Sequence, residues 1–267
     1  MSTEAITIAR ASSNRKLRDA VILITVFAAG AACCWQFRLP WVVANFLLMG
    51  LPLAYLLLTS EQARRRVRPK FTVLFIIFAI VAFDYMCERY EGWGGPSVFP
   101  FRLPGGVTLE EVQWIVFFFP LTFALNEHFF ATEVRTPPNR AARLVLKSSF
   151  YAGLLAVLAL ALSVKTIPHI YVMVGLVLQP FFILLGIWVN RWIVREVLWI
   201  GLVTGLLNLV FELIALRNNY WSFPGTYVGQ VRLLRFEFPV EELLFLILFS
   251  GPSIVCTYAI YKNWKQM

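Results

Sequence analysis

The sequence is poor in charge for its length: only 15% of its 267 residues are Asp, Glu, Lys or Arg. A soluble globular domain is about one quarter charged and about half apolar, whereas 59% of this chain is apolar. The shortage of charge extends along the whole chain, which excludes a water-soluble fold. The composition therefore predicts an all-α protein of the membrane class, since helices satisfy their own backbone hydrogen bonds in lipid.

Histidine, paired cysteines and nucleotide-binding motifs are also scarce or missing. There are two histidines, far apart in sequence, and four cysteines, none of which forms a C-x-x-C pair. A zinc centre or a disulfide framework is therefore not expected, and the cysteines are predicted to be small buried apolar residues. The sequence has no G-x-G-x-x-G, P-loop or G-x-S-x-G motif, so it predicts no metal and no organic cofactor.

The net charge of +9 reflects basic residues that lie between the apolar runs. No basic stripe with aromatic residues for base stacking is present, so nucleic acid is not an expected partner. Basic residues are abundant in the N-terminal tail, in alternate loops and in the C-terminal tail. The positive-inside rule then predicts an inner-membrane protein with both termini in the cytoplasm.

Apolar stretches long enough, or nearly long enough, to span a bilayer recur along the chain. We expect about eight transmembrane helices: Ala20–Phe37, Trp41–Thr59, Phe71–Met86, Val112–Phe130, Leu146–Val164, Pro168–Val189, Val197–Leu216 and Val240–Tyr261.

The two halves of the chain match one another when the sequence is shifted by 128 residues, and after a longer loop in the second half by 131. The matched pairs share residue character: Arg15 and Arg143, Pro40 and Pro168, Phe83 and Phe211, Asp84 and Glu212, Arg89 and Arg217, Trp93 and Trp221, Pro96 and Pro224, Glu110 and Glu241, Glu111 and Glu242, Trp114 and Phe245. We interpret this as two parallel four-helix repeats. The predicted organisation is a cytoplasmic tail (1–19), a first repeat (20–131), a basic linker (132–145) and a second repeat (146–262).

Each predicted repeat carries the same acidic plan. An acid, Asp84 or Glu212, ends the third span, and a tryptophan follows nine residues later. A glutamate pair then opens the fourth span. One glutamate of each pair is also explained as a helix cap, and the tryptophans as interfacial residues. Asp84 and Glu212 are harder to explain structurally, because a carboxylate within a span costs about 3 kcal/mol on insertion scales.

Three kinds of function fit buried carboxylates among aromatic side chains. Acid–base catalysis through a carbocation suits a hydrophobic substrate, because paired carboxyls supply acid and base and aromatic faces stabilise cations. A membrane prenyltransferase using magnesium is a second reading, suggested by Asp84-x-x-x-Glu88-x-x-Glu91, although the second half lacks this pattern. A proton-coupled transporter is the third, although the acids lie near one face of the membrane.

The second half also carries the motif Glu212-x8-Trp221-Ser222-Phe223, followed by Gly229 and Pro239-Val240-Glu241-Glu242-x-x-Phe245. It resembles the repeat of the lycopene cyclase domain family, the integral-membrane carotenoid cyclases of bacteria, archaea and fungi. The first half departs from this pattern with Thr108 in place of proline, and the second has Glu212 where Asp is expected.

The resemblance implies an isomerase that closes the end-group ring of a linear carotenoid without net redox change. It implies a hydrophobic polyene substrate, contact with membrane lipid, association with other membrane enzymes of the carotenoid pathway, and no cofactor. The implied catalytic residues are Glu241, Glu242, Glu212, Asp84, Glu110 and Glu111. The implied substrate-binding residues are Trp93, Trp114, Trp221, Phe223 and Phe245.

Overall fold

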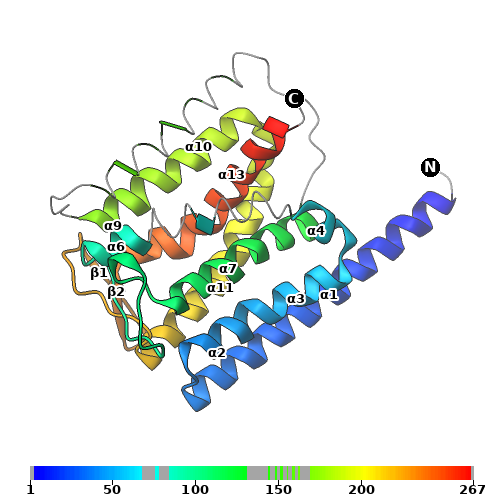
Figure 1. Ribbon diagram of the computed structural model, residues 1–267. Coiled ribbons are helices and arrows are strands. Elements are labelled where there is room, and N and C mark those ends of the chain that lie inside the picture. Colours follow the sequence, from blue (N-terminus) through cyan, green and yellow to red (C-terminus); the bar gives the residue numbers. More distant parts are fainter. Residues whose placement is uncertain are drawn as a thin grey trace.

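The computed structural model describes residues 3–67, 76–77, 84–130, 144, 148, 151–152, 155, 158–159, 162 and 169–265. These residues form a mostly helical bundle (Figure 1). In the first half the elements are α1 (Thr3–Phe37), α2 (Trp41–Asn45), η1 (Phe46–Gly50), α3 (Leu51–Thr59), α4 (Glu61–Arg66), α6 (Met86–Arg89), η3 (Pro104–Gly106), α7 (Leu109–Leu125) and η4 (Asn126–Phe130). In the second half they are α9 (Ile170–Val172), η5 (Met173–Leu178), α10 (Gln179–Val189), η6 (Arg191–Ile193), α11 (Val194–Asn218), β1 (Gln230–Leu233), β2 (Phe236–Pro239), α12 (Val240–Glu242), η7 (Leu243–Phe249) and α13 (Ser250–Lys265).

Four helical segments of the described chain are long and apolar enough to cross a membrane. They are Asn14–Phe37, Trp41–Thr59, Arg191–Asn218 and Val240–Ile260. They coincide with the first, second, seventh and eighth expected spans, which confirms a helical membrane protein. The first helix begins at Thr3, well before the predicted start at Ala20, so the predicted tail is part of α1.

The remaining expected spans differ in how far the structure describes them. The fourth corresponds to continuous helix from α7 into η4, and the sixth to α9, η5 and α10. The third and fifth, Phe71–Met86 and Leu146–Val164, and the linker 132–145 fall mainly outside the described residues.

The two halves meet along α7 and α13. Helix α7 packs against α2, η1 and α3 on one side and against α13 on the other, while α13 also packs against α10 and α11. Both helices bury large apolar side chains, including Phe118, Phe123 and Ile254. Helix α1 crosses to the second half, where the Arg217 Nε donates to the Trp35 carbonyl at 3.0 Å. The cores of the two halves are therefore continuous.

Helix α1 is also fixed to the first half through a buried carboxylate. Asp19 is completely buried and accepts a hydrogen bond from the Tyr55 hydroxyl at 2.8 Å. The His128 Nε2 lies 3.1 Å from its second oxygen, and the His128 Nδ1 lies 2.8 Å from the Ser60 hydroxyl. This polar cluster ties α1 to α3 and η4 at the end of the bundle that carries α4.

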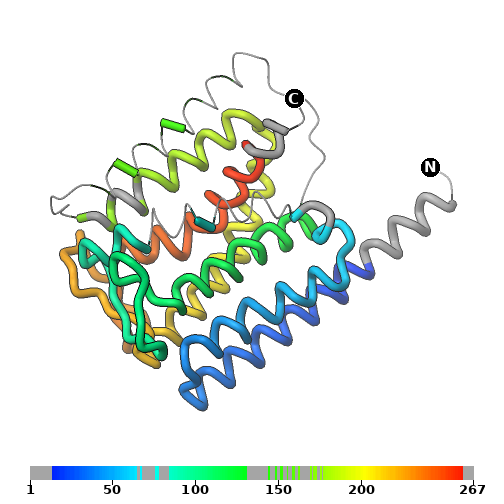
Figure 2. The backbone as a smooth tube through the Cα atoms, viewed as in Figure 1, coloured from blue at the N-terminus to red at the C-terminus, as the bar shows by residue number. Residues whose placement is uncertain are grey.

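The opposite end of the bundle carries the two long connections 90–108 and 219–239, and we call it the loop end. Figure 2 shows these two segments, green and orange, gathered there. The segment 219–239 contains a two-stranded antiparallel sheet in which Val231 pairs with Phe238 and Arg232 with Glu237. The all-α prediction missed this hairpin, although the alternation of apolar and charged residues in both strands is its signature.

The two connections are joined by paired backbone hydrogen bonds. The Gly94 amide donates to the Ser222 carbonyl at 3.0 Å, and the Ser222 amide donates to the Gly94 carbonyl at 2.7 Å. The neighbouring Gly95 packs directly on the Tyr220 backbone, where a Cβ would overlap the carbonyl oxygen. A glycine is therefore required where the first connection crosses the second.

Candidate functional site

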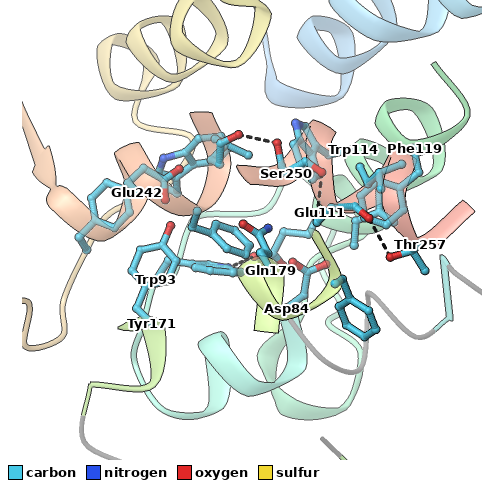
Figure 3. Close-up of a pocket in the computed structure, with 18 of the residues that line it drawn as sticks. Asp84, Trp93, Glu111, Trp114, Phe119, Tyr171, Gln179, Glu242, Ser250 and Thr257 are labelled. Atoms are coloured by element: carbon cyan, nitrogen blue, oxygen red, sulfur yellow. Dashed lines mark hydrogen bonds between the residues drawn. The ribbon is translucent and has the colours of Figure 1, made fainter. Parts of the chain in front are cut away.

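A partly open cavity lies between the two halves near the loop end. The cavity and its mouth together contain about 860 Å³ of non-atom space, part of which is open solvent. Its wall is mainly aromatic, and three carboxylates face it: Asp84, Glu111 and Glu242 (Figure 3). Carboxyl groups and aromatic rings, which lie near one another in both halves of the sequence, thus line the same cavity.

Glu111 is held in place by the start of α7. The Thr108 hydroxyl accepts a hydrogen bond from the Glu111 amide at 3.2 Å, and the Thr108 amide donates to the Glu111 carboxylate at 2.5 Å. This is a capping box, so the helix-cap interpretation holds for Glu111. The carboxylate also accepts a hydrogen bond from the Trp93 Nε1 at 3.0 Å. Glu111 therefore caps a helix and lines the cavity at once.

Glu242 occupies the matching position in the second half but is held differently. Helix α12 begins after Pro239, and no side chain caps it. Glu242 is 4% exposed, and no donor within the described residues binds its carboxyl group. Asp84, from the end of the third expected span, is 6% exposed and has a buried oxygen without a described partner. Among the described residues, no hydrogen-bond donor is recorded for Glu242 or for the Oδ2 atom of Asp84.

The first glutamate of each pair points to the loops instead of the cavity. The Val98 amide donates to Glu110 at 2.6 Å, and the Ser97 hydroxyl donates to the other oxygen at 2.9 Å. The Val228 amide donates to Glu241, also at 2.6 Å. Both carboxylates are buried. They fix the two loop-end connections to the helices, and neither is among the residues that line the cavity.

Glu212 is also outside the cavity lining. It lies on α11, is completely buried, and accepts a hydrogen bond from the Trp221 Nε1 at 3.2 Å. The two matched tryptophans thus bind different acids: Trp93 binds the acid that opens the fourth span, and Trp221 binds the acid that ends the third. Of the six predicted catalytic carboxylates, the cavity brings together Asp84, Glu111 and Glu242.

All five predicted substrate-binding residues line the cavity: Trp93, Trp114, Trp221, Phe223 and Phe245. Their rings are held by neighbouring rings. The Trp93 centroid lies 5.1 Å from that of Tyr171, and the Trp221 centroid lies 5.2 Å from that of Trp41. Trp41 and Tyr171 were not predicted, although each begins the second expected span of its half.

Polar side chains that the sequence reading passed over also line the cavity. Gln179 is buried at the start of α10, and Ser250, Ser253 and Thr257 lie along α13. The Ser253 and Thr257 hydroxyls donate to backbone carbonyls of α13, and the Ser250 hydroxyl donates to the Leu246 carbonyl of η7, so none of these three hydroxyls is a free donor. An amide in an otherwise apolar span was the one sequence signal for Gln179.

Glu88 lies behind the cavity, under the first loop-end connection. Its side chain is 9% exposed, and its carboxylate is 3.7 Å from the Arg102 Nη1. Burial and the neighbouring Glu111 carboxyl together raise the pKa of Glu88 to about 8, and Arg102 opposes this rise. Across the described residues, no group of three His, Cys, Asp or Glu side chains has the arrangement of a metal site.

Comparison with known proteins gives no relative from which a function can be read. No family model matches the chain, and no curated protein and no solved structure is significantly similar to it.

Proposed function

We propose that the chain is a membrane enzyme that cyclises the end group of a linear carotenoid, lycopene or a similar polyene, by acid–base catalysis. The observation that carries this proposal is the cavity in which Asp84, Glu111 and Glu242 face Trp93, Trp221 and other aromatic rings. A polyene end group needs an apolar cavity, a proton donor, a base and aromatic faces that stabilise a cation. The cavity supplies aromatic faces and three carboxyl groups that could take the roles of proton donor and base, which supports the proposal.

The reaction moves one proton in and one proton out. A carboxylic acid protonates the terminal double bond, which leaves a tertiary carbocation. The neighbouring internal double bond attacks this carbon, the ring closes, and the positive charge moves into the ring. A carboxylate then removes a ring proton and restores a double bond. The sum is an isomerisation, so neither an oxidant nor a reductant is consumed.

The hydrogen bonds divide these roles among the three cavity carboxyls. Glu111 accepts N–H hydrogen bonds from Trp93 and Thr108, which favour its ionised form. We assign it as the base and as the counter-charge of the cation. Glu242 and Asp84 are buried without described donors, which favours the neutral acid. They are the proton-donor candidates.

The same proposal includes a chain built from two four-helix copies related by a two-fold axis along the membrane normal. Gly94 and Ser222 are matched residues at the 128-residue offset, and they exchange both backbone hydrogen bonds. Such a pair has local two-fold symmetry. The π-helical segments η1 and η5 and the helices α3 and α10 also begin at or near matched positions, Leu51 and Gln179. If segments 71–86 and 146–164 are also transmembrane helices, each copy has four and the chain has about eight.

Pigment analysis tests the function directly. Cells that accumulate lycopene are given the gene, and their pigments are separated by chromatography; we expect a monocyclic or bicyclic carotenoid. The Glu111→Gln and Glu242→Gln variants should insert and leave lycopene unchanged. Unchanged lycopene with the wild-type chain, or full conversion by both variants, contradicts the proposal. Magnesium-dependent consumption of a prenyl diphosphate, or substrate-driven proton flux in proteoliposomes, would replace it with one of the other two functions.

A further inference from the structure

A row of charged groups connects the cavity with the solvent at the loop end. Asp84 and Glu111 line the cavity, and their charges interact. The Glu88 and Glu111 carboxyl groups lie within hydrogen-bonding reach of one another. Glu88 in turn faces Arg102, whose side chain is 39% exposed. From the cavity to the solvent, the row therefore consists of Asp84, Glu111, Glu88 and Arg102, in that order.

The first loop-end connection holds this row in place. The Arg102 guanidinium donates to the Gly106 carbonyl at 2.7 Å and to the Gly95 carbonyl, so it bridges the connection. The Glu88 carboxylate lies beneath the same connection, close to Gly94 and Gly106. One of its oxygens is buried without a hydrogen-bond partner among the described residues. That oxygen, Oε1, lies 3.7 Å from the Arg102 Nη1, so the Glu88 carboxyl stands between the Glu111 carboxyl and an exposed arginine, where it can accept and pass on a proton.

We propose that Glu88 is a proton-relay residue, through which the Asp84–Glu111 pair exchanges protons with the solvent at the loop end. The need for such a relay rests on the proposed function. When the acid and the base are different carboxyls, each turnover leaves the acid ionised and the base protonated, and both must be reset. Glu88 takes the proton from Glu111 and releases it beside Arg102. Where Asp84 is the proton donor, the reverse steps return a proton to Asp84 through Glu111. No proton is gained or lost overall.

The second half has no such route at the matched position. Glu88 corresponds to Leu216 on α11, and the row of acids has no counterpart there. The relay makes the two halves functionally unequal even where their folds match.

Infrared spectroscopy tests the relay without any substrate. The purified protein in lipid is moved from H₂O to D₂O, and the carbonyl band of protonated buried carboxyls is followed. The part of the band that belongs to the pair is identified with Asp84→Asn and Glu111→Gln. We expect Glu88→Gln to slow the exchange of that part by about tenfold or more. Glu88→Asp, which keeps a titratable group, should exchange faster than Glu88→Gln. The control Glu91→Gln removes an exposed carboxylate nearby and should exchange at the wild-type rate.

The outcomes separate the relay from packing and from the proposed function. Wild-type exchange in Glu88→Gln overturns the relay, and so does equal slowing in Glu88→Asp and Glu88→Gln, which would show a packing effect. Thermal unfolding in detergent shows whether Glu88→Gln retains the fold. If exchange depends on Glu88 but the wild-type chain leaves lycopene unchanged, the relay stands and the cyclase proposal fails. If lycopene is cyclised while exchange is independent of Glu88, only the relay fails.

Discussion

The matched acids of the two halves are held by different partners. In the first half Glu111 caps a helix, binds Trp93 and approaches Glu88, so it belongs to a connected polar row. In the second half Trp221 binds Glu212 away from the cavity, and Glu242 faces the cavity without a described donor. Matched acids can therefore differ in environment: Glu111 accepts hydrogen bonds from described donors, and none is described for Glu242, which is the difference on which the proposed roles rest.

The largest expected effect comes from removing either member of this unequal pair. Glu111→Gln and Glu242→Gln should each lower ring formation by about 10²–10⁴-fold, the usual contribution of an acid or base. Product formation per amount of inserted protein is the measurement. Glu237→Gln, an exposed carboxylate on β2, is the matched control. An equally large loss in the control would mean that the assay reports folding.

The tryptophans should separate activity from stability. Trp93→Phe removes a hydrogen bond to the cavity base, and we expect about a tenfold loss of turnover, equivalent to about 1.4 kcal/mol. Trp221→Phe leaves the buried Glu212 without its donor, and should lower the free energy of unfolding by about 1–3 kcal/mol. Turnover and thermal unfolding in detergent are measured on both variants. Identical profiles for the two would contradict the difference between the halves.

The first glutamates should behave alike, because both hold loops. Glu241→Gln keeps an oxygen that can accept from the Val228 amide, and should cost less than Glu241→Ala, for which about 1–2 kcal/mol is expected. Glu110→Ala should cost more than Glu241→Ala, since Glu110 accepts from both Ser97 and Val98. Thermal unfolding of the three variants checks this order. If Glu241→Gln lost turnover while its stability was unchanged, Glu241 would have a catalytic role and not only a structural one.

The smallest effect is the part of the pH dependence of stability that Glu88 supplies. The pKa of Glu88 is raised to about 8 in the folded chain, so the folded state holds this proton more tightly than the unfolded chain does. Its contribution to stability is complete below the ordinary pKa of glutamate and is lost as pH rises through about 8. Thermal unfolding between pH 5 and about 9 should show this decline in the wild type and a flatter curve in Glu88→Gln. The same curve in both would remove Glu88 as the cause.

Much of the fold follows from the sequence because lipid leaves few choices. The spans Trp41–Thr59 and Val240–Ile260 could be placed from apolar length alone, since every backbone group there must bond within its helix. The hairpin β1–β2 was missed because the positive φ of Leu234, 58°, is not a feature that a leucine predicts. The shared character of matched residues predicted the acids and tryptophans of the site.

The division of labour among those acids could not be read from the sequence. Glu110 and Glu111 are adjacent and chemically identical, and they are separated only by helix geometry, which turns one to Val98 and the other to the cavity. Glu88 is not among the predicted catalytic residues, because the matched position in the second half is Leu216. In the described structure Glu88 lies between Glu111 and Arg102 in the first half, at a position where the second half has a leucine.

The measurement that tests the central claim most directly is cyclisation by the purified chain. Lycopene is incorporated with the protein into lipid vesicles in D₂O, without flavin, nicotinamide or added metal, and the products are analysed by mass and retention time. The account predicts cyclic carotenoid that carries solvent-derived deuterium in the new ring, and no product from Glu242→Gln. Lycopene recovered unchanged from the folded wild-type chain would contradict it.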